Sequence, residues 1–256
     1  MSSQMRSGTA SGLSVVVPMF NEQALARDSL GAIGAACRAL VSAGRIADYE
    51  VIAVDDGSAD ATAMILDELA TADSHIHVVH HEHNSGLGCA IRSGIARARF
   101  SLVLYMDADL PFDLAELDAA CAVFDEGADV FTAYRLNRMT EGWRRMSYSF
   151  VYNLLVRFAF GLRVKDVNFA FKIVRRELLD QITLVSDGSF IDVELLVSAQ
   201  RLGSEIVQRG VRYLPRSHGT STLSSVAVIV KILKELFAFR RRSNTRCSTK
   251  PAPSGP

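Results

Sequence analysis

The sequence predicts an α/β domain, with a mostly parallel β-sheet that has helices on both faces. Short apolar segments alternate with helical segments at close intervals. The strand segments are apolar throughout, which is typical of parallel sheets buried on both sides. Hydrophobic residues make up 49% of the 256 residues, enough for one core of good size. These observations favour a layered fold with right-handed crossovers.

Residues 13–79 are predicted to contain three strands and two helices. A valine-rich run forms the first strand, and proline ends it. The second helix begins at a capping residue, Asp60 or Thr62. The expected order is strand 13–17 closed by Pro18, helix 23–43, strand 50–54, a helix to about residue 70, and strand 76–79.

The next segments repeat the alternation. A glycine-bearing turn at 84–88 opens a helix at about 89–98, and strand 101–106 follows it. A helix of about 114–125 and a strand at 129–133 come next. We expect a disordered leader at 1–12, one domain at 13–222, an amphipathic helix at 223–242 and a disordered tail at 243–256.

Charge and cysteine usage exclude several classes of protein. The 28 basic and 28 acidic residues cancel, which argues against a nucleic-acid partner held by bulk charge. Removing the five basic residues of the C-terminal tail leaves 23 basic residues against 28 acidic ones, so the body is acidic. The four cysteines lack CxxC spacing, and the polar N-terminus lacks an apolar signal core. A reduced, cytosolic compartment is therefore expected.

Polar residues follow three of the predicted strands. They are Asn21–Glu22, Asp55–Asp56 and Asp107–Asp109. In open α/β sheets, ligands bind at the carboxyl ends of the strands. We therefore expect the three clusters to share one edge of the sheet. The simpler alternative, that strand-end acids cap the next helix, is favoured for Asp60 alone.

The pair Asp107 and Asp109 suggests a metal site. In an extended segment, side chains two residues apart point the same way. Two carboxylates could then hold one hard cation, Mg²⁺ or Mn²⁺, with substrate phosphates completing its shell. Asp55 and Asp56 would be free to accept hydrogen bonds from a nucleobase or a ribose.

Several segments together resemble family 2 glycosyltransferases of the GT-A fold. The resemblance extends over roughly residues 13–225. Within the family, the sequence most resembles polyprenyl-phosphate sugar synthases of the dolichol-phosphate mannose type. It rests on SVVVPMFNE, YEVIAVDDGSADAT, HNSGLGCAIRSGI and LVLYMDADL, and for the narrower match on AYR, VKDVNFAFKIVRREL, GSFIDVELLVSAQRLG and RSHGTSTL.

The resemblance implies a role for each matching residue. Pro18, Asn21, Glu22 and Asp55 would line the nucleotide-base pocket, and Asp56 would lie beside the ribose and the sugar. The metal would be held by Asp107 and Asp109. The remaining matches are a turn that approaches the nucleotide, phosphate-holding positions, and an acidic pair near the acceptor: Asn84 and Gly88; Arg135, Arg216 and Ser221; Asp192 and Glu194.

The activity implied is an inverting, metal-dependent transfer of a sugar from a GDP- or UDP-linked donor to a polyprenyl phosphate. An ionised phosphate needs cations rather than a strong base, whereas a hydroxyl acceptor usually needs a carboxylate base. Asp192 is the candidate base for a hydroxyl acceptor, and a helix cap is the alternative role for it. A third hypothesis is a catalytically silent nucleotide-sugar-binding module.

Three positions depart from the family pattern. A glutamine that often helps to hold the metal is replaced by Pro111, so Asp113 or water would have to substitute. The usual SGF reads Asn168-Phe169-Ala170, and the basic residue after GxS is Thr222. These changes weaken the assignment of mannose rather than that of the family.

Histidines crowd residues 75–83. A metal site would need geometry as well as number. His75 and His77 are more simply explained as exposed residues of an edge strand. His218 lies beside Arg216 and either donates to a phosphate or is an ordinary loop residue.

Two amphipathic segments suggest contact with a membrane. Residues 222–242 have a wide apolar face followed by an arginine cluster, and residues 146–162 are flanked by arginines. We expect interfacial helices on an anionic membrane surface, with the protein bound peripherally at the inner face. Core packing is the alternative for 222–242. No uncharged stretch reaches the roughly 18 residues of a spanning helix.

Overall fold

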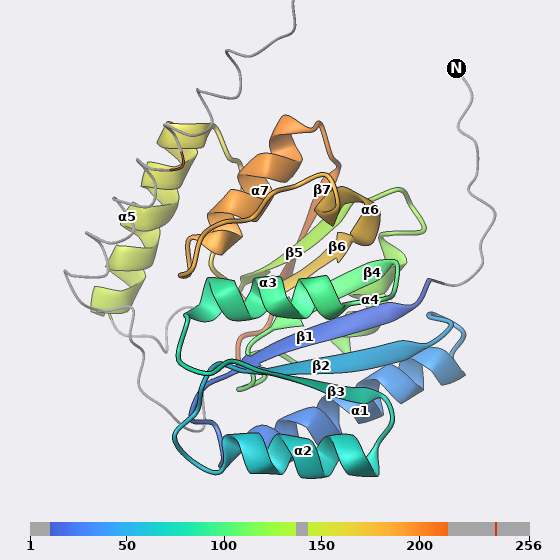
Figure 1. Ribbon diagram of the computed structural model, residues 1–256. Helices are drawn as coiled ribbons and strands as arrows, with labels where there is room; N and C mark the ends of the chain where they lie inside the picture. Colours follow the sequence, from blue (N-terminus) through green and yellow to red (C-terminus); the bar gives the residue numbers. More distant parts are fainter. Residues whose placement is uncertain (1–10, 137–142, 215–238, 240–256) are drawn as a thin grey trace, which may run out of the picture. The chain divides into compact units, whose positions relative to one another are not determined.

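A computed structural model describes residues 11–136, 143–214 and 239. Figure 1 labels its helices and strands. Along the chain these elements are β1 (Leu13–Met19), α1 (Ala26–Ser42), β2 (Tyr49–Asp55), α2 (Thr62–Ala72), β3 (Ile76–His80), α3 (Leu87–Arg97), β4 (Leu102–Met106), α4 (Glu116–Ala122), β5 (Val130–Arg135), α5 (Trp143–Phe160), β6 (Phe171–Arg175), α6 (Arg176–Leu179), α7 (Ile191–Arg201) and β7 (Ile206–Val211).

The chain divides into two compact units, residues 1–219 and 220–256, and every helix and strand named above belongs to the first. The ordered part begins before β1, since Ser11 and Gly12 accept backbone hydrogen bonds from Ala47 and Leu102. These two residues were placed in the predicted leader, whose other residues, 1–10, lie outside the described residues, so the leader stays a prediction. The predicted helix 223–242 and tail 243–256 lie outside the described residues, apart from residue 239, so they stay predictions.

Seven strands form one sheet in the order β3-β2-β1-β4-β6-β5-β7. The first four strands are parallel to one another, and β7 is parallel to β5. Only β6 runs against its neighbours β4 and β5. The prediction of a mostly parallel α/β sheet is confirmed. The carboxyl ends of β1, β2, β4 and β5 consequently lie along one edge of the sheet.

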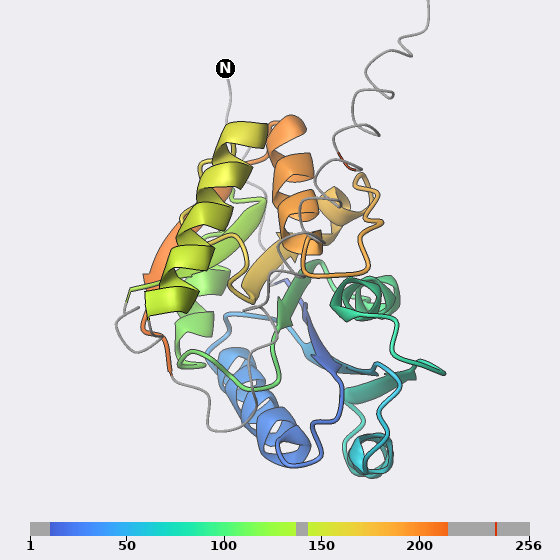
Figure 2. The same ribbon diagram turned by 90° about the vertical axis from the view of Figure 1, so that its left-hand side faces the viewer.

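Both faces of the sheet are covered, as the apolar strands predicted. Val15 and Val17 belong to a core cluster that includes α1 and α4 residues such as Leu30 and Leu117. The alternate residue Val16 faces α3, so closely that a Cβ on Gly94 would collide with it. Figure 2 shows α1 and α3 on opposite sides of the sheet. This double cover explains why the strands lack a polar face.

Element boundaries differ from the predictions by a few residues. Pro18 does not end β1, which continues to Met19. Helix α1 begins at Ala26 instead of 23, because a turn forms first, with two N–H groups donating to the Glu22 carbonyl. Helix α3 begins two residues earlier than expected, at Leu87. Helix α4 covers only 116–122, since turns replace both of its predicted ends.

Candidate active site

The carboxyl-end edge of the sheet collects the polar residues that the sequence singled out. Asn21 and Glu22 follow β1, Asp55 ends β2 beside Met19 of β1, and Asp107 follows β4. Arg135 ends β5 at the same edge. The parallel pairing of β1 with β2 and β4 is what brings segments far apart in sequence to one edge.

The loop after β1 is fastened to the loop after β2. Asn21 has a φ of 56°, a left-handed conformation that asparagine tolerates better than most residues. Its side-chain Oδ1 accepts from the N–H of Ala59 at 2.8 Å, and its own N–H donates to Ser58 Oγ at 3.0 Å. The N–H of Glu22 donates to Thr62 Oγ1 at 2.9 Å. The residues proposed for the base pocket are thus held as one unit.

Asp60 serves both this junction and the helix that follows. Its Oδ1 accepts from the N–H of Thr62 at 2.9 Å, and its Oδ2 accepts from the N–H of Gln23 at 3.2 Å. The capping role expected for Asp60 is confirmed, although the residue at the N-cap position itself is Ala61.

Asp55 is buried, with 3% of its surface exposed. Its Oδ1 accepts from the N–H of Ser58 at 3.0 Å, and its Oδ2 lies 3.1 Å from His80 Nδ1. The expectation of a carboxylate free for a ligand is therefore only partly right. Each oxygen already has one partner, and a carboxylate offers about four lone-pair sites.

Asp56 clamps the loop before α3. Its two oxygens accept from the N–H groups of Ser85 and Gly86, both at 2.9 Å, and Oδ1 also lies 2.7 Å from His81 Nδ1. Three donors converge on this buried side chain. The protein therefore uses this carboxylate to shape its own loop, and the place of Asp56 beside a ribose stays a prediction.

Position 88 requires glycine because another backbone segment of the protein packs against it. A Cβ at this position would collide with the carbonyl of Ser186, and its N–H donates to the Asp187 carbonyl at 2.9 Å. The resemblance implied that the backbone at this turn approaches a nucleotide. In the structure the close approach is to residues 186–188 instead, while Asn84 in the same turn is exposed.

The metal motif lies on a turn. Strand β4 ends at Met106, and the N–H of Leu110 donates to the Asp107 carbonyl at 3.4 Å. The premise of an extended Asp-Ala-Asp segment is therefore wrong. The turn is fixed from α1, where the Ser29 hydroxyl donates to the Ala108 carbonyl. Both carboxylate oxygens of Asp109 are buried.

These two carboxylates fit a hard divalent cation. Mg²⁺ and Mn²⁺ prefer oxygen ligands, and Mg²⁺ is commonly held by one or two carboxylates together with substrate phosphates and water. Among the described residues no group of three or more His, Cys, Asp or Glu side chains is arranged to hold a metal. The donor set thus suits a metal that arrives with its substrate.

Pro111 has a structural contact in place of a side-chain ligand. Its carbonyl accepts from the N–H of Leu214 at 2.9 Å, and Phe112 forms an isolated bridge with Tyr213. Asp113, the predicted substitute ligand, accepts from the N–H of Ala115 at 3.0 Å just before α4. The chain that leads towards residue 216 therefore lies beside the metal turn.

Arg135 is paired within the protein. Its Nε and Nη2 donate to the two oxygens of buried Asp166 at 2.7 and 3.1 Å. The guanidinium lies 5.6 Å from the ring centres of both Phe169 and Tyr213. This two-pronged pairing fixes the orientation of the guanidinium at the end of β5.

Asp192 lies in a buried network and does not cap a helix. Helix α7 begins at Ile191, one residue earlier. Asp192 Oδ1 accepts from the Tyr105 hydroxyl at 2.6 Å and pairs with Lys172 Nζ at 2.7 Å. Lys172 Nζ also donates to the Phe169 carbonyl at 2.7 Å. Burial, and then the Asp192 charge, hold the pKa of Tyr105 well above its usual range.

Glu194, the second member of the acidic pair, supports a loop. Its Oε2 accepts from the N–H groups of Val185 and Ser186 at 2.9 and 2.8 Å. The same loop is the one that packs on Gly88. Arg92 of α3 adds an ion pair to Asp187 at 2.7 Å.

Sequence reasoning missed the residues that hold the candidate site in place. They are Ser29, Tyr105, Asp166 and Lys172, together with the specific roles of His80 and His81. One signal was available, since lysine inside the apolar run Phe171–Val174 is unusual unless paired. Two of the predicted residues, Arg216 and Ser221, lie outside the described residues, as do His218 and Thr222.

The other histidines of the cluster lie on or beside β3, which is an edge strand of the sheet, as expected. His75 and His77 are nevertheless not plain surface residues. His75 stacks on Tyr49 and pairs with Asp73, and His77 lies 3.5 Å from Glu50. Within the described part of the chain, none of the helices has the length and apolarity needed to cross a bilayer.

A mostly parallel α/β sheet with acidic residues at the carboxyl ends of its strands defines a class of ligand-binding α/β proteins. Comparison with known families is more specific. The model of "Glycosyl transferase family 2" matches residues 14–183, so the chain belongs to that family and is a glycosyltransferase.

Two curated relatives show what the chain is similar to. It is 30% identical over 224 residues to a polyprenol monophosphomannose synthase of Mycolicibacterium smegmatis, covering 82% of this chain and 80% of the relative. It is 31% identical over 218 residues to an undecaprenyl-phosphate 4-deoxy-4-formamido-L-arabinose transferase of Pseudomonas fluorescens, covering 85% of this chain. The chain spans only 62% of that second relative.

Solved structures support the fold. Glucosyl-3-phosphoglycerate synthase from Mycobacterium tuberculosis, in complex with Mn²⁺, UDP and phosphoglyceric acid, matches with a TM-score of 0.65 at 20% identity. The match covers 94% of this chain and 80% of that one. The same enzyme with Mg²⁺ and UDP matches with a TM-score of 0.63.

Proposed function

We propose that this protein transfers a sugar from a UDP- or GDP-linked donor to a polyprenyl phosphate, in an inverting reaction that depends on Mg²⁺ or Mn²⁺. The names of its relatives support this proposal, because both describe sugar transfer to a polyprenol-type lipid phosphate. Structural neighbours that contain UDP with Mn²⁺ or Mg²⁺ are consistent with the donor and the metal.

The observation that carries the choice of acceptor is the state of Asp192. A hydroxyl acceptor usually needs a general base within hydrogen-bond reach. Asp192, the base predicted for that alternative, is 4% exposed and already bound to Tyr105 and Lys172. A phosphate monoester has its second pKa at about 6 and is ionised near neutral pH without a base. The locked carboxylate therefore favours a phosphate acceptor over a saccharide or small-molecule hydroxyl.

The reaction is a single displacement. A phosphate oxygen of the acceptor attacks the anomeric carbon, the bond from that carbon to the diphosphate breaks, and the nucleoside diphosphate leaves with its electron pair. Inversion follows from one displacement. Arg135, Arg216 and Ser221 are proposed to hold phosphates, and Pro18, Asn21, Glu22 and Asp55 to hold the base. Bound at Asp107 and Asp109, the metal supplies Lewis-acid stabilisation of the leaving diphosphate.

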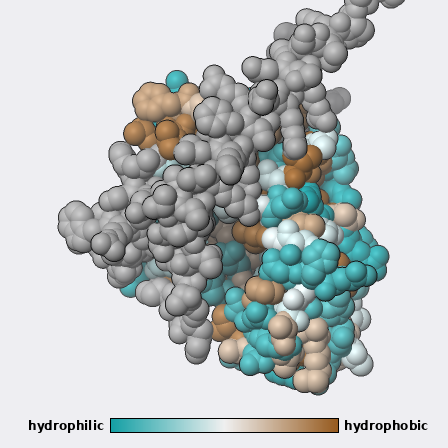
Figure 3. Space-filling view, turned by 60° about the vertical axis from the view of Figure 1, so that its left-hand side comes forward, coloured by the Kyte–Doolittle hydropathy of each residue, from teal (hydrophilic) through white to brown (hydrophobic). Residues whose placement is uncertain are grey.

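A membrane surface is the proposed location of the acceptor. Helix α5 exposes Leu154, Leu155 and Phe158, the last with 81% of its surface accessible, and Arg157 beside them is also exposed. In the space-filling view a hydrophobic patch stands out on the side where α5 lies (Figure 3). Apolar side chains next to a cation suit the surface of an anionic bilayer. These exposed side chains support the proposal of peripheral binding, for which we propose the cytoplasmic face of the membrane.

A two-phase transfer assay tests the proposal. Labelled nucleotide-sugars, with Mn²⁺ or Mg²⁺, are supplied to the protein with and without polyprenyl phosphate in vesicles. Label that enters the organic phase only with the lipid supports the proposal and identifies the donor. Label that enters a water-soluble saccharide instead would favour a hydroxyl acceptor. Nucleotide-sugar binding with no turnover on any acceptor would favour a silent binding module.

A further inference from the structure

The end of β3 places two histidines against the two carboxylates at the end of β2. In the parallel register Asp55 is the partner of His80. His80 lies between two acids, with Nδ1 3.1 Å from Asp55 Oδ2 and Nε2 3.0 Å from Asp67 Oδ1 of α2. The next residue, His81, lies between Asp56 and the Ser93 hydroxyl, at 2.7 and 2.9 Å.

The two carboxylates differ in the capacity that remains to them. Asp56 accepts from two backbone N–H groups as well as contacting His81, so it is committed to the loop before α3. Asp55 has one partner at each oxygen, Ser58 and His80. One further hydrogen bond at each oxygen is compatible with carboxylate geometry. Asp55 is therefore the acid of this pair with more remaining capacity for a ligand, since Asp56 has one further partner.

The contacts of His80 with both Asp55 and Asp67 determine which protonation state of the ring satisfies them. A neutral imidazole donates from one nitrogen only, whereas an imidazolium donates from both. With two ionised carboxylates, both contacts become hydrogen bonds only when the ring carries two protons. The charged groups that contact the ring are Asp55 from β2 and Asp67 from α2. Burial lowers the pKa of His80, but hydrogen bonds to Asp67 and Asp55 and their charges outweigh it, so the pKa is raised.

We propose that His80 is a positioning residue for donor binding, which as an imidazolium bridging Asp55 and Asp67 fixes the Asp55 carboxylate for the N–H groups of the nucleobase. This inference rests on the proposed function only for the presence of a nucleotide donor at Asp55. It does not depend on which acceptor receives the sugar. Loss of the second ring proton leaves Asp55 with an imidazole that must serve one acid at a time, and donor affinity falls.

Nucleotide binding as a function of pH tests this role. The dissociation constants of UDP and GDP are measured by calorimetry with Mn²⁺ over a pH series that begins near the ordinary pKa of histidine, about 6.5, and rises above it. For the wild type, the tighter nucleotide is expected to lose about tenfold in affinity as the pH rises through the His80 pKa, which corresponds to one hydrogen bond to a charged group. In His80→Gln the affinity is expected to be weak and independent of pH.

Two further variants separate positioning from simple folding support. Asp67→Asn removes one of the charges that raise the His80 pKa, so the loss of affinity is expected to move to lower pH. His75→Gln is the matched control, since His75 pairs with Asp73 before the other end of β3 and should leave both the affinity and its pH dependence unchanged. Thermal unfolding of each variant confirms that it is folded.

The possible results distinguish failure of the His80 role from failure of the proposed donor site. Unchanged affinity and pH dependence in folded His80→Gln would overturn the role of His80 and leave the donor site standing. The same would follow if wild-type affinity did not depend on pH. Failure of the wild type to bind either nucleotide would overturn the proposed donor itself, and the inference with it.

Discussion

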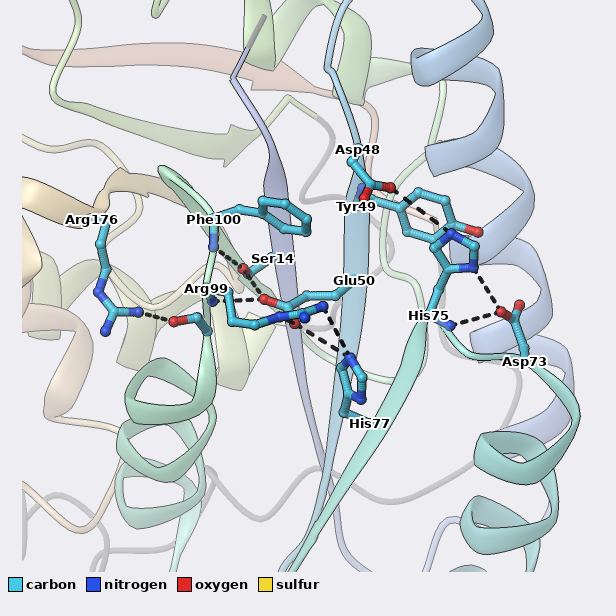
Figure 4. A network of polar contacts seen from close by, with 11 residues as sticks. Ser14, Asp48, Tyr49, Glu50, Asp73, His75, His77, Arg99, Phe100 and Arg176 are labelled. Carbon is cyan, nitrogen blue, oxygen red and sulfur yellow. Dashed lines mark hydrogen bonds and ion pairs between the residues drawn. The ribbon is translucent and has the colours of Figure 1, made fainter.

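The two ends of β2 carry buried acids that are held in different ways. Glu50, at the amino end, is surrounded by fixed donors: its oxygens accept from the Ser14 hydroxyl at 2.6 Å and from the backbone N–H and Nε of Arg99 at 2.7 and 2.8 Å (Figure 4). Asp55, at the carboxyl end, has one loop N–H and one histidine. The first acid is fully used by the protein, and the second keeps capacity for a ligand.

The difference shows how a parallel sheet separates stability from function. The amino ends of the strands are joined by direct contacts between protein groups, which include Arg99 with Glu50 and the Phe100 N–H, which donates to Ser14 Oγ at 3.1 Å. At the carboxyl ends the loops are longer and carry the acids that match the family. Burial alone does not distinguish these acids, since Glu50 and Asp55 are both nearly inaccessible. The number and kind of donors distinguishes them.

Substitution of Asp192 gives the largest expected effect on stability. Asp192 lies towards the functional edge of the sheet but, like Glu50, is bound by donors from the protein. Asp192→Ala leaves the Lys172 ammonium buried without its counter-charge, which costs about 3–5 kcal/mol of unfolding free energy. Denaturant unfolding measures this loss. The double variant Asp192→Leu with Lys172→Met should recover most of it. A stable Asp192→Ala that loses only activity would place Asp192 with the reactive acids instead.

Asp109 represents the reactive side of the comparison. Asp109→Ala is expected to lower metal-dependent turnover by about 100-fold or more, because the diphosphate leaving group loses its cation, while the fold stays intact. Steady-state transfer at several Mn²⁺ concentrations measures this effect. Asp118→Ala in α4 is the matched control, because it removes an exposed acid that pairs with Arg45, and it should cost at most about 1 kcal/mol with unchanged turnover. Retained turnover in Asp109→Ala would contradict the metal assignment.

Gly88 tests whether the loop before α3 is shaped by protein contacts. Gly88→Ala forces a methyl group into the backbone of residues 186–188, so a loss of about 1–3 kcal/mol is expected in thermal unfolding. Gly31→Ala in α1 has open space around it and should stabilise the protein by about 0.5–1 kcal/mol. Equal effects of the two substitutions would show that the close approach at Gly88 is absent in solution.

Glu50 gives an effect that is confined to stability and that disappears at low pH. Burial raises the pKa of Glu50, but hydrogen bonds from Ser14 and Arg99 outweigh it, so the pKa is lowered. Its contribution is therefore complete above the unfolded pKa of about 4.3 and is lost as the pH falls through the folded value. Glu50→Gln should cost about 1–3 kcal/mol at pH 7 and progressively less below pH 4. Unchanged donor KM and kcat in this variant would complete the contrast with Asp55.

The sequence was sufficient for strands β1 to β5 and for the edge that carries the site, whereas β6 and β7 were not predicted. Asp55 and Asp107 each follow an apolar strand, and the direction of a parallel strand determines the edge of the sheet at which its last residues lie. Their position could therefore be predicted from the sequence. The buried partners could not be predicted in the same way. Lys172 meets Asp192 only because β6 runs antiparallel beside β4, where Tyr105 and Lys172 are register partners. Such pairings depend on strand order, which short-range patterns do not encode.

The prediction that the Asp107-Ala108-Asp109 segment is extended was wrong for a related reason. The turn depends on Ser29, a residue of α1 that lies far from it in the sequence. The short-range pattern likewise did not indicate that N–H groups of the loop before α3 donate to the Asp56 oxygens. In each case a contact distant in sequence decided what a local motif does.

The choice of acceptor is the central claim, and a matched pair of lipids tests it most directly. Polyprenyl phosphate and the polyprenol of the same chain length are compared in vesicles of the same composition, with the same labelled donor and metal. Because Asp192 is held by Lys172 and Tyr105, we expect transfer to the phosphate and none above background to the alcohol. Comparable transfer to the polyprenol would mean that a base activates the hydroxyl, and would contradict the account.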